Sequence, residues 1–97
     1  MTELLTPAER KTLTAIVAKI EAATSLSDID HVALAAEIAK VWHRERDDDE
    51  ITARLSNAEY AVSNMDDEEN EEFEDAATWA VQSLNRVLDY RRPRKPA

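Results

Sequence analysis

The chain has 97 residues, a length that suits one domain with a single modest core. It contains no glycine and three prolines, so the positive-φ turns of tight β-hairpins would depend on Asn or Asp, and we expect an all-α fold. The absence of cysteine excludes disulfides and thiolate metal sites, and a net charge of −9 at pH 7 disfavours direct binding to nucleic acid or anionic membranes.

The first helix is predicted to begin at Pro7 and to run to about Ala23. Thr6 stands at a plausible N-cap and Glu9 follows three residues later, which is the order of a capping box. Apolar residues then recur with the helical period on one face, which we expect to be buried: Leu13, Ile16, Val17 and Ile20.

The second helix is expected to be capped by Ser27 or Asp28. At about 100° per residue, its inward positions are Leu34, Ala35, Ile38, Val41 and Trp42.

The third helix is predicted to begin in the acidic run 47–50, which supplies a cap and a negative first turn. Its apolar residues follow the 4, 3, 4, 3 spacing of a helix that packs lengthwise along a neighbour. They are Ile51, Leu55, Ala58, Val62 and Met65. A turn is expected at 64–67.

The fourth helix is predicted from about Asp67 to Arg91, ahead of Pro93 and Pro96. Its expected buried face consists of Phe73, Ala77, Ala80, Val81, Leu84, Val87 and Leu88. Residues 1–91 should form one antiparallel bundle of three to four helices, and residues 92–97 a flexible basic tail. The first helix either joins an up-and-down bundle or packs across three main helices.

Acidic residues are concentrated in two windows. Residues 45–50 hold five and residues 66–75 hold eight of the 21 carboxylates. Carboxylates side by side along a helix can imitate the phosphate rows of nucleic acid and attract a basic protein. They are also typical of a solvated helix N-terminus, and both interpretations stay open.

Trp79 falls about 140° from the middle of the expected buried face of the fourth helix. Ser83, Arg86 and Tyr90 follow it at offsets of 4, 7 and 11 residues. Trp, Arg and Tyr are the residue types most enriched in interface hot spots, so this row indicates a partner or self-association surface. Alternatively, another part of the chain covers Trp79, or Arg86 stacks beside the aromatic residues.

Signatures of catalysis or metal binding are not found. His31 and His43 lack the paired Glu-x-x-His motifs of bundle metal sites, and the serines lack a glycine-framed elbow. No apolar run is long enough to span a bilayer and no signal segment is seen. We therefore expect a cytoplasmic protein without enzymatic activity, cofactor or metal.

The leading hypothesis is a non-enzymatic acidic binding protein that occupies a basic or nucleic-acid-binding surface of a partner protein, as an inhibitor, an immunity protein or a DNA mimic does. The alternative is a homo-oligomeric structural or adaptor module, such as a homodimer. The candidate partner-binding residues are Asp66, Asp67, Glu68, Glu69, Glu71, Glu72, Glu74, Asp75, Trp79, Ser83, Arg86 and Tyr90.

Overall fold

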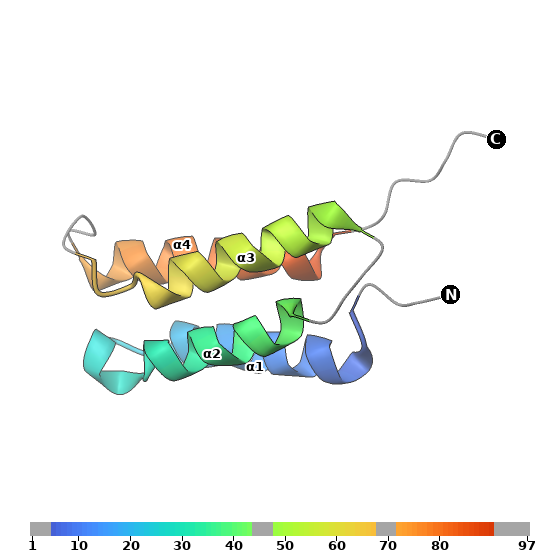
Figure 1. The fold of residues 1–97 in the computed structure, drawn as a ribbon. Helices are drawn as coiled ribbons and strands as arrows, with labels where there is room; N and C mark the ends of the chain where they lie inside the picture. Colours follow the sequence, from blue (N-terminus) through green and yellow to red (C-terminus); the bar gives the residue numbers. More distant parts are fainter. Residues whose placement is uncertain (1–4, 44–47, 68–71, 91–97) are drawn as a thin grey trace.

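The computed structural model describes residues 5–43, 48–67 and 72–90 of the chain. Within these ranges it has four α-helices and one short 3-10 helix, and successive helices run in opposite directions (Figure 1). The predicted all-α bundle is therefore confirmed. The elements are α1 (Pro7–Ala22), η1 (Leu26–Asp28), α2 (His31–Trp42), α3 (Asp49–Ser63) and α4 (Phe73–Leu88).

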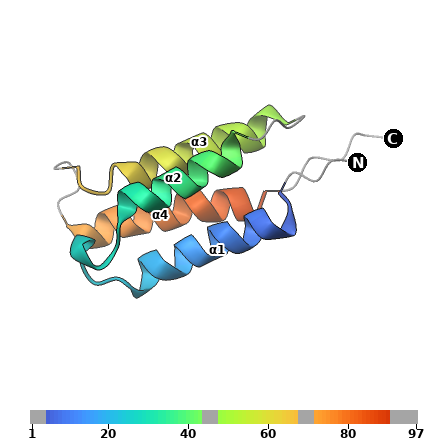
Figure 2. The same cartoon turned by 60° about the horizontal axis from the view of Figure 1, so that its bottom comes forward.

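The four helices form two layers, with α3 and α4 in one and α1 and α2 in the other (Figure 1). Helix α2 packs against α3, α3 against α4, and α4 against α1, whereas α1 and α2 touch least among these neighbours. Figure 2 shows α1 running lengthwise beside α4. The up-and-down arrangement is thus the one adopted, and α1 does not cross the other three helices.

Side-chain caps fix where three of the helices begin. The hydroxyl of Thr6 accepts from the amide of Glu9 at 3.1 Å, and the Glu9 carboxylate accepts from the Thr6 amide at 2.9 Å, so the predicted capping box is present. Asp48 caps α3 by accepting from two first-turn amides, within the predicted acidic run.

The cap of α2 differs from the prediction. Asp30, rather than Ser27 or Asp28, accepts from the amide of Ala33 at 3.1 Å. The Asp28 carboxylate is engaged elsewhere, because it accepts from the amide and hydroxyl of Thr24 and from the amide of Ser25. These hydrogen bonds lower the pKa of Asp28 and hold the turn that includes η1.

The predicted inward faces of α1, α2 and α3 line one core, although Trp42 is only partly buried against it. The side chains that are fully excluded from solvent and largest in volume come from all four helices, which shows that no helix is peripheral to the fold. They are Leu13, Ile16, Ile20, Ile38, Ile51, Leu55, Val62, Leu84 and Val87.

Helix α4 begins later and ends earlier than predicted. Glu72 has an extended backbone and precedes the first helical residue, and Asp89 follows the last one. Like charges three and four residues apart do not favour helix, which accounts for a later start than Asp67. Residues 68–71, and the predicted end at Arg91 with the tail 92–97, lie outside the described residues.

The buried face of α4 is rotated by roughly 50° from the predicted face, at 100° per residue. Its most buried residues are Ala76, Ala80, Ser83, Leu84 and Val87, while Phe73, Ala77, Val81 and Leu88 are only partly buried. The rotation follows from packing, because α4 contacts α3 more extensively than α1. Small side chains on that side let the two helices approach closely.

Candidate partner-binding surface

An exposed aromatic pair lies where α3 and α4 meet. The rings of Tyr60 and Trp79 are 5.9 Å apart between centroids and inclined at 73°, an edge-to-face arrangement. Tyr60 is 61% exposed and Trp79 is 39% exposed, and they are two of the three large apolar residues with most exposure in the described part of the chain. The outward position of Trp79 is therefore confirmed, but the residue leans on α3 rather than standing free.

Exposed carboxylates lie near this pair. Asp75 precedes Trp79 by one helical turn on the same side of α4. Because α3 and α4 are antiparallel, Asp66 and Asp67, in the turn after α3, lie toward the same end as the start of α4 (Figure 2). Glu72, Glu74 and Asp75 are all exposed. The candidate residues Glu68, Glu69 and Glu71 lie outside the described residues.

The carboxylates at the start of α4 remain uncompensated by the described part of the chain. Within residues 5–43, 48–67 and 72–90, no hydrogen bond or ion pair neutralises Glu72, Glu74 or Asp75. Glu72 does not cap the helix through its side chain. The dipole of α4 favours negative charge in its first turn, yet these side chains stay open to solvent and to a cationic partner.

The row predicted from Trp79 to Tyr90 does not form one continuous outer surface. Ser83 is only 7% exposed, so its predicted outward orientation is wrong. The rotation of α4 toward α3 carries Ser83 into the interface and leaves Trp79 at its edge. Arg86 is exposed, whereas Tyr90 is half-buried and packs against the core. The exposed surface therefore centres on Tyr60 and Trp79, and Tyr60 is the member that the sequence analysis missed.

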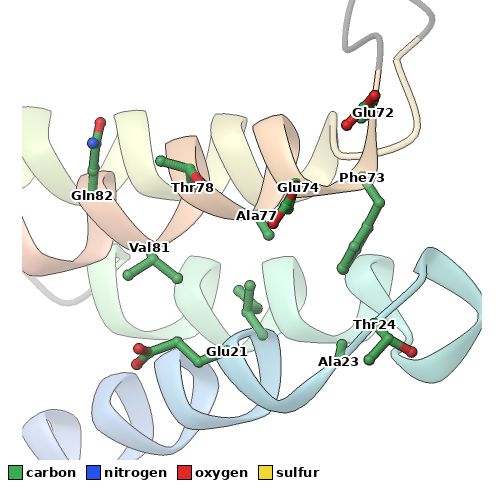
Figure 3. Close-up of a pocket in the computed structure, with 11 residues that line it drawn as sticks. Glu21, Ala23, Thr24, Glu72, Phe73, Glu74, Ala77, Thr78, Val81 and Gln82 are labelled. Atoms are coloured by element: carbon green, nitrogen blue, oxygen red, sulfur yellow. The ribbon is translucent and has the colours of Figure 1, made fainter.

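A groove of about 650 Å³ opens on the other side of α4, between α4 and the end of α1. The partly buried residues Phe73, Ala77 and Val81 line it from α4, and Ile20 lines it from α1. Figure 3 shows the Phe73 ring extending from the start of α4 toward Ala23 and Thr24. The later start of α4 and its rotation leave this apolar surface incompletely covered by α1.

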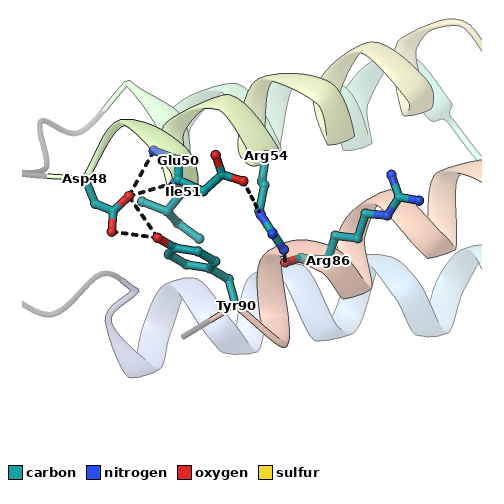
Figure 4. Close-up of polar contacts among 6 residues, drawn as sticks. All are labelled: Asp48, Glu50, Ile51, Arg54, Arg86 and Tyr90. Atoms are coloured by element: carbon teal, nitrogen blue, oxygen red, sulfur yellow. Dashed lines mark hydrogen bonds and ion pairs between the residues drawn. The ribbon is translucent and has the colours of Figure 1, made fainter. Parts of the chain in front are cut away.

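Tyr90 belongs to a cluster at the opposite end of the bundle (Figure 4). Its hydroxyl donates to the Asp48 carboxylate at 2.9 Å, and the guanidinium of Arg54 lies 4.8 Å from the centre of its ring. Arg54 also pairs with Glu50 and donates to the carbonyl of Arg86 at 2.8 Å. Desolvation, reinforced by the bond to Asp48, raises the pKa of Tyr90. This cluster joins the start of α3 to the end of α4.

Both histidines and the second tryptophan have contacts within the fold. The Nδ1 of His31 donates to the carbonyl of Val62 at 3.2 Å, and its Nε2 lies 3.9 Å from the Asp66 carboxylate. The ring of His43 stacks on Trp42 with centroids 4.4 Å apart, and the indole N–H of Trp42 donates to Glu59. These contacts tie α2 to α3 and to the turn that follows it.

The described ranges hold neither a cluster of metal-ligand side chains nor a membrane-spanning helix. No three His, Cys, Asp or Glu side chains among these residues gather as possible ligands of a metal ion. None of the helices in these ranges combines the length and the apolar character needed to cross a bilayer.

Comparison with known proteins gives no relative from which a function can be transferred. No protein-family model, curated protein or solved structure matches the chain. A function for this chain is therefore inferred from its own surfaces.

Proposed function

We propose that the protein is a non-enzymatic acidic binding protein that occupies a basic or nucleic-acid-binding surface of a partner protein. Its binding surface comprises the Tyr60–Trp79 pair and the carboxylates of Asp66, Asp67 and Asp75, and we refer to it as the α3–α4 face. The class of protein would be an inhibitor, an immunity protein or a DNA mimic. We also predict that the protein binds this partner in the cytoplasm.

The observation that supports this proposal most is the exposed aromatic pair beside exposed carboxylates, of which Asp75 is not neutralised by any residue that the structure describes. Trp and Tyr supply large contact areas at a small cost in conformational entropy, and they are common interface anchors. Two such rings from different helices, already in contact at 5.9 Å, form a preorganised anchor. The geometry thus combines an apolar centre with a charged periphery, as protein interfaces commonly do.

The charge would act mainly on the rate of encounter. Acidic residues attract a basic surface over roughly a Debye length, about 10 Å at 0.1 M salt, and so raise the association rate constant. Desolvation of Tyr60 and Trp79 would then slow dissociation. The two kinds of residue on the α3–α4 face therefore have separable kinetic roles.

A capture experiment tests the proposal. Wild-type protein and the variant Tyr60→Ala are immobilised and exposed to a lysate of the source organism, and retained proteins are identified by mass spectrometry. Tyr60 is 61% exposed, so its truncation should leave the fold intact. We expect a basic protein to bind the wild type and to bind the variant about 30-fold more weakly, the factor that corresponds to about 2 kcal/mol.

The matched control is Val32→Ala, which truncates another strongly exposed apolar side chain, 64% exposed, on α2. It should bind the captured protein as the wild type does. Equal retention by all three baits would refute the role of the α3–α4 face. If light scattering instead shows a dimer that Tyr60→Ala dissociates, the homo-oligomeric alternative replaces the proposal.

A further inference from the structure

The groove between α1 and α4 has the character of a docking site distinct from the α3–α4 face. Its accessible apolar surface comes from Ala23, just after α1, and from Phe73, Ala77 and Val81 on α4. A volume of about 650 Å³ falls in the range of protein pockets that bind ligands. The two surfaces use different sides of α4, since Trp79 does not line the groove.

Carboxylates surround this apolar surface. Glu21 lines the groove from α1, and Glu72 and Glu74 line it from the start of α4 (Figure 3). All three are exposed. In the part of the chain that the structure describes, no cationic side chain pairs with any of these three carboxylates. A ligand that filled the groove with apolar groups would therefore meet negative charge on both sides.

We propose that this groove binds a short cationic amphipathic helix of a partner protein, with apolar side chains in the groove and Lys or Arg beside the carboxylates. Such a helix lays its apolar face into a hydrophobic groove, which is a recurrent mode of peptide recognition. The inference is independent of the function proposed for the α3–α4 face, because none of its apolar contacts involves Tyr60 or Trp79.

The dimensions of the groove agree with this occupant. Phe73 and Val81 are eight residues apart on α4, a separation of about 12 Å at 1.5 Å per residue. Side chains at positions i and i+7 of a bound helix are separated by about 10.5 Å along its axis. Two turns of helix would therefore place apolar residues along the full groove.

Charge also distinguishes among occupants. A second copy of this chain carries the same net charge of −9, so its approach to an acidic groove is opposed by repulsion. Phosphate groups of nucleic acid are repelled for the same reason. A cationic helix is attracted and gains contacts with Glu21, Glu72 and Glu74.

The test uses a 14-residue helical peptide of leucine and lysine, with leucine at the i, i+3, i+4 and i+7 positions of one face. Binding is followed by NMR titration of the full chain. We expect the largest shifts at the methyl groups of Ala23, Ala77 and Val81. A peptide with the same leucines but glutamate in place of lysine should bind at least about tenfold more weakly.

A pair of isosteric double variants isolates the charges of the groove. Glu21→Gln with Glu74→Gln should weaken the lysine peptide about tenfold at low salt. The control, Asp49→Asn with Asp89→Asn, changes the net charge equally at the opposite end of the bundle and should change affinity less than about twofold. Equal losses in both double variants, shifts centred on Tyr60 and Trp79, or no binding of the lysine peptide would each overturn the proposal.

Discussion

Replacing Leu84 with alanine perturbs the core where α4 meets the other helices. Leu84 is 0% exposed, and the nearby positions Ala80 and Ser83 on the same buried face are too small to fill the space it leaves. Truncation of a buried leucine costs about 2–5 kcal/mol, with larger values where the site cannot collapse. We expect about 3–5 kcal/mol here, a large share of the roughly 5–15 kcal/mol typical of a small domain.

Urea unfolding monitored by far-UV circular dichroism measures this loss. The midpoint should fall with little change in the m-value, and the melting temperature should fall by at least about 10 °C. Gln82→Ala is the matched control, since Gln82 is exposed on the same helix and its truncation should change stability by less than about 0.5 kcal/mol. A loss below about 1 kcal/mol for Leu84→Ala would show that the helical phase of α4 is wrong.

Three further outcomes follow from single side chains. The pKa of Tyr90 is raised in the folded state. The stability that Tyr90 contributes is therefore present below its unfolded pKa of about 10 and is lost as the pH rises through the folded pKa. Replacing Tyr90 with phenylalanine should flatten the alkaline part of a profile of melting temperature against pH. The pKa of Asp28 is lowered in the folded state, so the stability that Asp28 contributes is present above its unfolded pKa of about 3.9 and is lost as the pH falls through the folded pKa. Replacing Asp28 with asparagine should flatten the acid part of the same profile. An unchanged slope there would contradict the hydrogen bonds to Thr24 and Ser25. Trp79 is 39% exposed and its ring packs edge-to-face on that of Tyr60, so Trp79→Ala should cost about 1–2 kcal/mol in denaturant melts, whereas a loss of more than about 4 kcal/mol would place it in the core.

Much of the fold could be predicted because local signals and the apolar period agree. The Thr6 capping box and the spacing from Ile51 to Met65 each specify a helix and its buried side without reference to other helices. The cap of α2 could not be chosen in this way. Asp28 and Asp30 are both good caps by residue type, and only the engagement of Asp28 with Thr24 leaves Asp30 for the helix.

The candidate surface was predicted less completely, because it depends on how α4 rotates against its neighbours. Periodicity located the apolar side of α4, but closer packing on α3 than on α1 set which edge is covered. Ser83 was therefore misplaced, and the groove beside Phe73 was missed. The small residues Ala76 and Ala80 were a usable signal, since small side chains on one edge favour close helix approach there.

The salt dependence of association tests the central claim most directly, namely that the acidic α3–α4 face steers a basic partner protein. The association rate constant of the captured protein, measured by stopped flow from about 0.05 to 0.5 M salt, should fall at least about tenfold. Neutralising Asp66 and Asp75 to asparagine should reduce this slope more than neutralising Asp49 and Asp89 at the far end of the bundle. A rate constant that does not change with salt, or equal slopes for the two double variants, would contradict the claim.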